Sequence, residues 1–252
     1  MVHFVGAGPG AADLITLRGA EHLRGADVIV YAGSLVNPAL LALAKDGCRI
    51  YNSAEMTLEQ VLDVLLAAEK AGLAAVRLHT GDPSLYGAIR EQMDALAAAG
   101  ISYDVTPGVS SFCGAAAALN AEYTLPGVSQ SVIITRLAGR TPVPGGEELS
   151  ALAAHGASMV IFLSAGMLPA VQQALLRGAY TDATPAAIVY KATWPEERVV
   201  RCTVGTLAES GAAAGIRNTA LILVGDFLGP DYERSRLYDA SFTTGFRQGE
   251  PL

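Results

Sequence analysis

The sequence has few charged residues, few aromatic residues and only three cysteines among its 252 residues. The charged fraction is 16% against 51% hydrophobic residues, and acidic residues outnumber basic ones by 24 to 17. This negative balance argues against non-specific binding to nucleic acid or to an acidic membrane surface. Cys48, Cys113 and Cys202 show neither metal-type nor redox-type spacing. We therefore expect buried or inert thiols in a reducing cytosol and no metal site.

Long apolar runs are also lacking. Every apolar stretch of transmembrane length is interrupted by a charge, a glycine or a proline, so no membrane-spanning helix is expected. Residues 1–6 lack the basic region and the long apolar core of a signal peptide. The sequence therefore predicts a soluble, cytoplasmic protein with no membrane partner, and its 252 residues suffice for one large or two modest domains.

Strand-like and helix-like segments alternate along the first half of the chain. An amphipathic helix is expected after Thr57, which forms a capping-box pattern with Gln60. Nearly continuous apolar strands that alternate with helices predict a mostly parallel sheet covered on both faces. The expected strands are residues 2–5, 28–31, 48–51, 73–78 and 103–105.

The second half repeats this alternation, but Pro195 stands between two strand-like runs and indicates a hairpin-like turn. A hairpin predicts a mixed sheet here. We therefore expect two α/β domains, residues 1–113 and 114–240, followed by a polar, glycine-rich surface tail at 241–252. The expected strands are residues 131–135, 159–163, 186–190, 199–202 and 220–224.

Residues 79–87, with the sequence HTGDPSLYG, follow a predicted strand and precede a predicted helix. The carboxyl ends of strands are where open α/β sheets bind ligands. Gly81 permits close approach to the main chain, Asp82 can accept hydrogen bonds, and Ser84 suits the N-cap of the following helix. An ordinary turn uses the same residue types, so that interpretation stays open.

A glycine-rich loop at residues 6–10 follows the first strand and matches the dinucleotide fingerprint in its letters. That fingerprint needs an acidic residue at the end of the second strand. Here the second strand ends at Tyr31, and Asp27 lies at its other end. Pro9 also removes an amide from the turn that would hold a pyrophosphate. The loop therefore disfavours NAD and favours a tight turn that lines a cleft.

Four segments together resemble the tetrapyrrole (precorrin and uroporphyrinogen) methylase family, and the match runs in order over about residues 2–228. The segments are residues 5–10, 80–83, 106–111 and 218–221. Others resemble the branch of that family that methylates C-11 of precorrin-4 or of its cobalt form; they are residues 31–36, 79–92, 135–144 and 189–195. One departure is that Ala11 and Ala12 stand where the family usually has an acidic residue, with Asp13 shifted along.

The resemblance implies C-methylation in cobalamin biosynthesis. It implies two α/β domains with a cleft between them, S-adenosylmethionine held folded in that cleft, and a homodimer. The residues that the resemblance places at the cofactor are Pro9 at the cleft mouth, Gly81, Asp82, Leu85, Ser110, Ser111, Ser164, Ala165, Ala192, Thr219 and Ala220.

Methyl transfer from a sulfonium needs alignment and exclusion of water more than acid–base chemistry, which agrees with the lack of a nucleophile–base pair. A polycarboxylate substrate in an acidic protein calls for local cations. The candidates at the substrate are Gly8, Tyr31, Arg136, Arg140 and Lys191; for the three cations, solvated surface charge is the alternative. His79 is a weak candidate for assisting proton loss, and a strand-end histidine bonded to neighbouring backbone is the interpretation we favour.

Three other functions stay open. A sister tetrapyrrole methylase would act at another carbon, and a diphthine-synthase-like methylase would act on a protein. A non-catalytic protein would bind the tetrapyrrole or a nucleotide without methyl transfer. The sequence leaves open whether the substrate carries cobalt.

Overall fold

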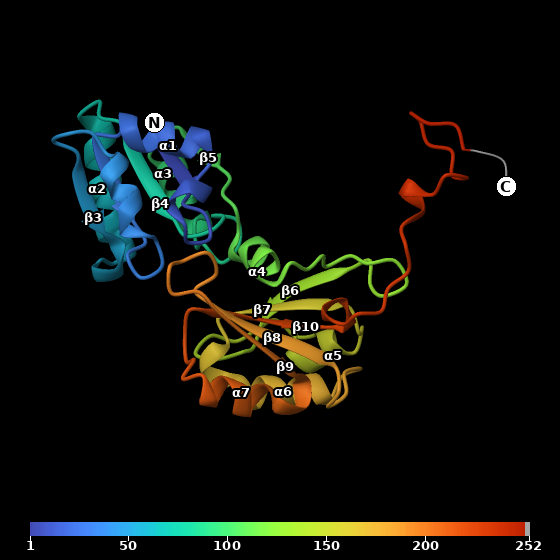
Figure 1. Ribbon diagram of the computed structural model, residues 1–252. Helices are drawn as coiled ribbons and strands as arrows, with labels where there is room; N and C mark the ends of the chain where they lie inside the picture. Colours follow the sequence, from blue (N-terminus) through green and yellow to red (C-terminus); the bar gives the residue numbers. More distant parts are fainter. Residues whose placement is uncertain (250–252) are drawn as a thin grey trace. The chain divides into compact units, whose positions relative to one another are not determined.

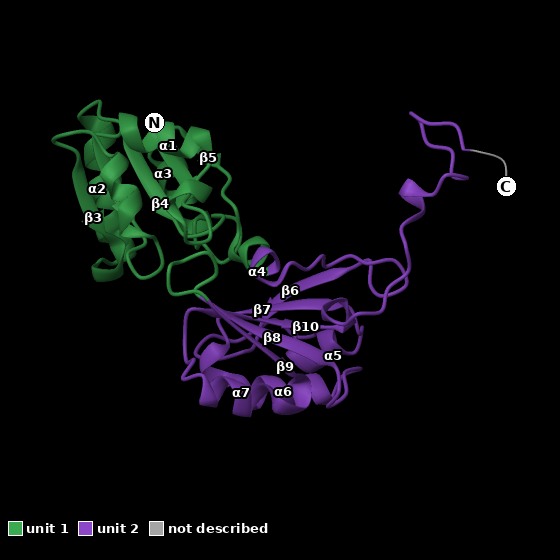
Figure 2. Cartoon of the chain, viewed as in Figure 1, with its two compact units in different colours: residues 1–115, 191–197 green, residues 116–190, 198–252 purple. Residues whose placement is uncertain are grey.

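The computed structural model describes residues 1–249, which fold into two α/β units with one five-stranded sheet each (Figures 1 and 2). Unit 1 comprises residues 1–115 and 191–197, and unit 2 comprises residues 116–190 and the described residues from 198 onward. The predicted α/β class, with a parallel sheet first and a mixed sheet second, is confirmed. The domain limits expected from the sequence stay a prediction. Residues 191–197 pack with unit 1 although they join two strands of unit 2, and no local sequence pattern indicated this.

The sheet of unit 1 has the order β3-β2-β4-β1-β5, and all of its pairings are parallel. The loops that follow these strands therefore emerge at one edge of the sheet. The strands are β1 (Val2–Gly6), β2 (Val28–Tyr31), β3 (Arg49–Asn52), β4 (Ala75–His79) and β5 (Tyr103–Thr106).

Helices cover both faces of this sheet because its strands are apolar on both sides. Val2 and Phe4 of β1 belong to a core with α2 and α3, whereas Val5 packs into a core with α1 and η2. Thr57 and Gln60 form the predicted capping box at α2. The helices are η1 (Ala12–Leu14), α1 (Leu17–Gly25), η2 (Pro38–Leu43), η3 (Ser53–Glu55), α2 (Leu58–Lys70) and α3 (Arg90–Ala98), and α4 (Ser111–Leu119) leads into unit 2.

Ser84 does not cap the helix that follows β4, so that prediction is wrong. The helix begins at Arg90, its N-cap is Ile89, and no side chain caps it. Tyr86 and Ala88 adopt φ angles of 57° and 50°, which lie in the left-handed region and prevent a right-handed helix from starting earlier. Ser84 instead donates a hydrogen bond from its hydroxyl to Asp82.

The sheet of unit 2 has the order β6-β7-β10-β8-β9. β6 and β7 are parallel, β10 is antiparallel to β7 and to β8, and β8 forms the predicted hairpin with β9. The carboxyl ends of β6, β7 and β8 therefore share an edge with the amino end of β10. The strands are β6 (Val132–Arg136), β7 (Ser158–Phe162), β8 (Pro185–Tyr190), β9 (Arg198–Thr203) and β10 (Ala220–Val224).

A large core in unit 2 joins one face of this sheet to its helices, with Met159, Ile188 and Ile222 from the strands. The helices are α5 (Leu149–Ala153), η4 (Ala165–Met167), α6 (Leu168–Leu176), η5 (Val204–Thr206), α7 (Leu207–Ala213), η6 (Asp226–Leu228) and η7 (Arg236–Tyr238). Over residues 1–249, no helix combines the length and apolar character that a membrane crossing needs.

Candidate functional site

The loops after β1 and β4 are held together by their main chains. Gly81 donates its amide to the carbonyl of Gly8 at 2.9 Å, and Gly8 donates in return at 3.3 Å. Ala7 donates to the carbonyl of His79 at 2.7 Å. Gly8 and Gly81 have φ angles of 82° and 57°, which are open to glycine at little cost. This pairing holds residues 6–10 and residues 79–87, two segments that the sequence analysis selected, side by side.

The loop after β5 joins them by direct backbone contact. A Cβ atom on Gly108 would lie 2.1 Å from the carbonyl oxygen of Gly81, and one on Gly6 would lie 2.6 Å from the Cα of Gly108. No side chain fits into such a space. Gly81 also lies against Ser110 and Ser111, since a Cβ there would be 3.5 Å from each backbone. Unit 1 thus brings together Gly8, Gly81, Ser110 and Ser111.

Asp82 fastens two of these loops with its carboxylate. Its Oδ2 accepts from the amide of Gly108 at 2.9 Å, and its Oδ1 accepts from the amide of Ser84 at 2.9 Å. Burial opposes ionisation of Asp82, but the hydrogen bonds from Ser84 and Gly108 outweigh it and hold the pKa of the carboxyl below its usual value. Leu85 belongs to the same turn, because its amide donates to the carbonyl of Asp82 at 3.2 Å.

Residues 191–197 pack on the first glycine-rich loop. The hydroxyl of Thr193 accepts from the amide of Ala11 at 2.9 Å, and a Cβ on Gly10 would lie 2.2 Å from the ring of Trp194 and 2.7 Å from the carbonyl oxygen of Ala192. Asn37 donates to the carbonyl of Gly10 at 2.8 Å. Ala192 thus lies beside the loop of Pro9. No local sequence pattern indicated the roles of Thr193 and Asn37, because these contacts join residues far apart in the chain.

In each unit, several residues other than glycine adopt left-handed backbone angles at or next to predicted positions. Such angles cost about 1–3 kcal/mol each and are concentrated at active sites and ligand clamps. Lys191 has a φ angle of 47° and pairs with Glu196 at 3.3 Å, and its ammonium lies 5.3 Å from the centre of the Trp194 ring. The other residues in this set that adjoin predicted positions are Tyr86, Ala88, Leu163, Thr193 and Thr219.

Two basic side chains are buried near the carboxyl end of β4. Arg77 donates to Gln92 at 3.0 Å and to the carbonyl of Val30 at 3.2 Å, and burial lowers its pKa to about 10. His79 is 3% exposed and stacks on Phe4, and its Nε2 has no hydrogen-bond partner among the described residues. Burial, and secondarily the charge of Arg77, lowers the pKa of His79 to about 3. We favoured a histidine bonded to neighbouring backbone, and Nε2 of His79 makes no such bond. Because its pKa is about 3, the ring is neutral at physiological pH.

In unit 2 the predicted positions lie along one edge of the sheet. The hydroxyl of Ser164, which is fully buried, accepts from the amide of Leu137 at 2.9 Å and donates to the carbonyl of Phe162 at 2.7 Å. This joins the loops after β6 and β7 and places Ala165 at the same point. Ala220 begins β10 opposite Tyr190, with Thr219 just before it.

The cations of unit 2 differ in their surroundings. Arg136 donates to the carbonyls of Thr141 at 3.1 Å and Pro142 at 2.6 Å, so its guanidinium is fixed against its own loop. Arg140 is exposed on that loop. In unit 1, Tyr31 ends β2, its carbonyl accepts from the hydroxyl of Ser53 at 3.1 Å, and its ring packs against the core that contains Ala7.

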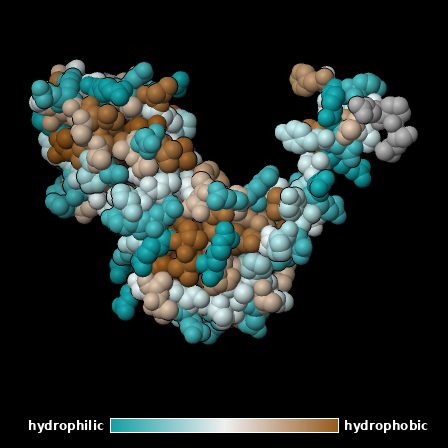
Figure 3. Space-filling view, viewed as in Figure 1, coloured by the Kyte–Doolittle hydropathy of each residue, from teal (hydrophilic) through white to brown (hydrophobic). Residues whose placement is uncertain are grey.

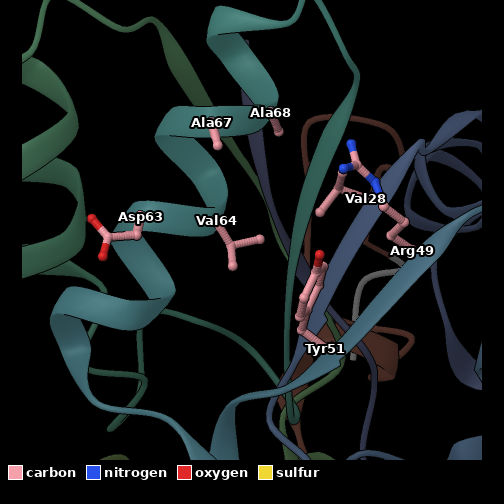
Figure 4. A pocket seen from close by; sticks show the side chains of 7 residues that line it. All are labelled: Val28, Arg49, Tyr51, Asp63, Val64, Ala67 and Ala68. Atoms are coloured by element: carbon pink, nitrogen blue, oxygen red, sulfur yellow. The ribbon is translucent and has the colours of Figure 1, made fainter.

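A cavity of about 210 Å³ opens elsewhere in unit 1, between α2 and strands β2 and β3 (Figure 4). None of the predicted site residues lines it. Its lining residues are Val28, Arg49, Tyr51, Asp63, Val64, Ala67 and Ala68.

Comparisons with known proteins agree with this geometry. The model of the tetrapyrrole (corrin/porphyrin) methylases matches residues 1–208. The chain is 50% identical over 248 residues to a cobalt-precorrin-4 C(11)-methyltransferase of Methanocaldococcus jannaschii, covering 98% of this chain and 96% of that protein. It is 45% identical over 250 residues to a precorrin-4 C(11)-methyltransferase of Pseudomonas aeruginosa, with 99% of each chain covered.

Two solved structures have the same fold. A cobalt precorrin-4 methyltransferase described as a cobalamin biosynthetic enzyme superposes with a TM-score of 0.89 at 44% identity, covering 91% of this chain and 96% of that one. A uroporphyrin-III C-methyltransferase of Thermus thermophilus, complexed with S-adenosylhomocysteine, superposes with a TM-score of 0.76 at 27% identity, covering 90% and 93%.

The contact among the three loops predicts a stability effect. Gly108→Ala should lower the free energy of unfolding by about 1–3 kcal/mol, because its methyl group would overlap the Gly81 carbonyl. Urea denaturation measures this. Gly25→Ala in α1 is the control, since an added Cβ there would meet no atom within 4 Å apart from its chain neighbours and its own helix backbone, and it should leave stability unchanged or raise it by up to about 1 kcal/mol. Equal stability of the two variants would contradict the contact.

The buried His79 predicts a dependence of stability on pH. Because its folded pKa lies below the unfolded value, the unfolded chain binds a proton that the folded chain does not, and stability falls as the pH drops below about 6.5. Between pH 7 and pH 5, wild type should lose about 2 kcal/mol more than His79→Gln. Urea unfolding at both pH values checks this. His155→Gln, which alters an exposed histidine, should retain the wild-type loss; a loss unchanged in His79→Gln would refute the role of burial.

Proposed function

The chain belongs to the tetrapyrrole methylase family and is a methyltransferase, and from this premise we propose that it transfers the methyl group of S-adenosylmethionine to C-11 of precorrin-4 or of its cobalt form. The observation that carries the proposal is 45–50% identity, over nearly the whole chain, to proteins named for that reaction. The reaction belongs to cobalamin biosynthesis. The cytoplasmic location expected from the sequence stays a prediction.

The residues of unit 1 suit a ligand held mainly by backbone groups. The paired loops of Gly8 and Gly81 are rigid and carry small side chains, so a ligand can approach the main chain closely. S-adenosylmethionine supplies a methyl group activated by the positive sulfonium when bound. We assign its binding in unit 1 to Pro9, Gly81, Asp82, Leu85, Ser110, Ser111 and Ala192, and in unit 2 to Ser164, Ala165, Thr219 and Ala220.

The task of these residues is alignment. Transfer to carbon needs the acceptor carbon in line with the methyl group and water kept away, and rigid positioning supplies much of the barrier reduction in such reactions. Asp82 contributes by fixing the loops of Gly81 and Gly108, because both of its carboxylate oxygens already accept from the protein. We assign no base: His79, with a pKa near 3, is a poor proton acceptor at neutral pH.

For the substrate's carboxylates we propose Arg136, Arg140 and Lys191, with Gly8 and Tyr31 as neighbours. Arg136 is the best prepared, since the carbonyls of Thr141 and Pro142 hold its guanidinium in one orientation. A guanidinium fixed in this way loses less freedom when it binds a carboxylate in bidentate fashion. Solvated surface charge remains the alternative for Arg140, which is exposed.

Turnover with isotopically labelled S-adenosylmethionine tests the function. Incubated with precorrin-4 or with cobalt-precorrin-4, the protein should deliver the label to C-11, which NMR of the product identifies. Ala192→Trp should weaken binding of S-adenosylhomocysteine at least about 10-fold, because a bulky ring beside Gly10 would fill space next to the backbone. The exposed Leu17→Ser, on α1, is the control and should bind normally.

The outcomes separate the rival functions. Label at another carbon would indicate a sister methylase, and label on a protein would indicate a protein methylase. Binding of S-adenosylhomocysteine with no transfer to either tetrapyrrole would indicate a binding protein. A relative named for precorrin-4 and one named for cobalt-precorrin-4 are each 46% identical to this chain, so these identities do not distinguish the two substrates. The rates of turnover with precorrin-4 and with cobalt-precorrin-4 therefore test which one is used.

We further propose that the protein is a homodimer to which its C-terminal arm contributes. The arm from residue 230 to 249 exposes large apolar side chains, and apolar patches also occur on both units on the face in Figure 3. Exposed apolar surface of this kind is typical of an interaction site. The exposed side chains of the arm are Tyr232, Leu237, Tyr238, Phe242 and Phe246.

A triple variant tests this assignment. Tyr238→Ser, Phe242→Ser and Phe246→Ser together should convert a dimer into a monomer in light scattering at micromolar concentration, because the apolar area that drives association is removed. Leu17→Ser, which removes one exposed apolar side chain from α1, should leave the dimer intact. A triple variant with the wild-type mass would contradict the role of the arm.

A further inference from the structure

Two histidines and a carboxylate meet on unit 1, on elements that the proposed methyl transfer does not use. His3 of β1 and Asp104 of β5 are register partners on adjacent strands, and β5 is an edge strand of the sheet. His22 lies in the last turn of α1, and its ring stacks on that of His3 with the centroids 4.0 Å apart. One nitrogen or oxygen ligand atom from each of the three lies within 4.8 Å of the others.

From this juxtaposition we propose a binding site for a divalent transition-metal ion of the zinc, nickel or copper type, with His3, His22 and Asp104 as protein ligands. Imidazole nitrogen suits these ions, and a carboxylate commonly completes such a set. The sequence predicted no metal site, because the three residues are too far apart in the chain for any spacing motif.

The separations are close to those of a bound ion. Nitrogen and oxygen ligands lie about 2.0–2.2 Å from zinc, which puts two ligands of a tetrahedral site about 3.4 Å apart. His3 Nδ1 is 2.8 Å from Asp104 Oδ1. No two of the three ligand atoms are more than 4.8 Å apart, so ion binding would shorten the longest of these distances by at most about 1.4 Å. Modest movement of the side chains therefore brings all three onto one ion.

His22 supplies the second indication. Its Nε2 is buried and has no hydrogen-bond partner among the described residues, so a lone pair or a proton is left without a partner there. Such groups in folded proteins call for an explanation, and an ion is one of the accepted ones.

An ion can reach this site from solvent, and its binding requires the rotation of one side chain. Asp104 is 46% exposed at its side chain and His3 is 17% exposed, so an ion can enter from solvent past the carboxylate. The two rings are only 25° from parallel, and an ion must lie near the plane of each imidazole. One ring must therefore turn about χ2, a torsion with a broad and shallow preference. Water would complete the coordination.

The site is separate from the proposed methyl transfer. His3 is the second residue of β1, near the amino end of the strand, whereas the loops of Gly8 and Gly81 follow the carboxyl ends. An ion here would join β1, β5 and α1. We therefore expect it to raise stability and leave the transfer rate unchanged.

Titration of the untagged full-length protein with Zn²⁺ tests the proposal. We expect one saturable site per chain, and a rise in Tm of about 3 °C in excess Zn²⁺, because an ion that binds only the folded state stabilises it. With Cu²⁺ at one equivalent, the electron paramagnetic resonance spectrum should show hyperfine splitting from two nitrogen ligands. Absence of saturable binding, or a spectrum without nitrogen splitting, would overturn the site.

Three variants locate the ion. His22→Gln and Asp104→Asn should each weaken Zn²⁺ binding at least about 10-fold, with Asp104→Asn as the milder change in case His22→Gln does not fold. His155→Gln, on unit 2, is the matched control and should bind as wild type does. Binding that survives both site variants, or that is lost in His155→Gln, would show that the ion lies elsewhere. Methyl transfer by the three variants should equal that of wild type whichever substrate form is used.

Discussion

Close contact between the backbones of Gly6, Gly81 and Gly108 is the constraint on which the proposed site of unit 1 depends. The parallel sheet delivers the loops after β1, β4 and β5 to the same edge, but only residues without a Cβ let them touch. Once they touch, the Gly8–Gly81 hydrogen bonds and the Asp82 carboxylate lock their relative positions. The result is a rigid surface of main-chain groups, which is what an alignment-based reaction requires.

The structural role of Asp82, which is to fix two loops, is also the basis of its proposed role in function. Considered from the sequence, it is a turn former or a ligand contact, and these look like competitors. In the fold its carboxylate binds the amides of Ser84 and Gly108, so it shapes the loops that face the proposed ligand. A residue that fixes the position of two loops supports transfer without touching the reacting atoms.

The strands, the two kinds of sheet and the hairpin around Pro195 could be predicted because they follow from local apolar patterns. The start of α3 could not, since the left-handed angles at Tyr86 and Ala88 override the favourable cap at Ser84. Nor could the contact of Thr193 with Ala11, which spans 182 positions. The unpartnered Nε2 of His79 and the His3–His22–Asp104 cluster likewise depend on tertiary packing that no spacing encodes.

The scarcity of charge also fits the chemistry. His79 is kept neutral by burial and by Arg77, and Asp82 is kept ionised by its hydrogen bonds, so neither changes protonation state near neutral pH. The electrostatic field that these two groups produce at the loops of unit 1 therefore does not change with pH near neutrality. A reaction whose donor is already activated depends less on a group that titrates at pH 7 than on the position and charge of its surroundings. Fixed protonation and fixed glycine contacts thus serve the same end.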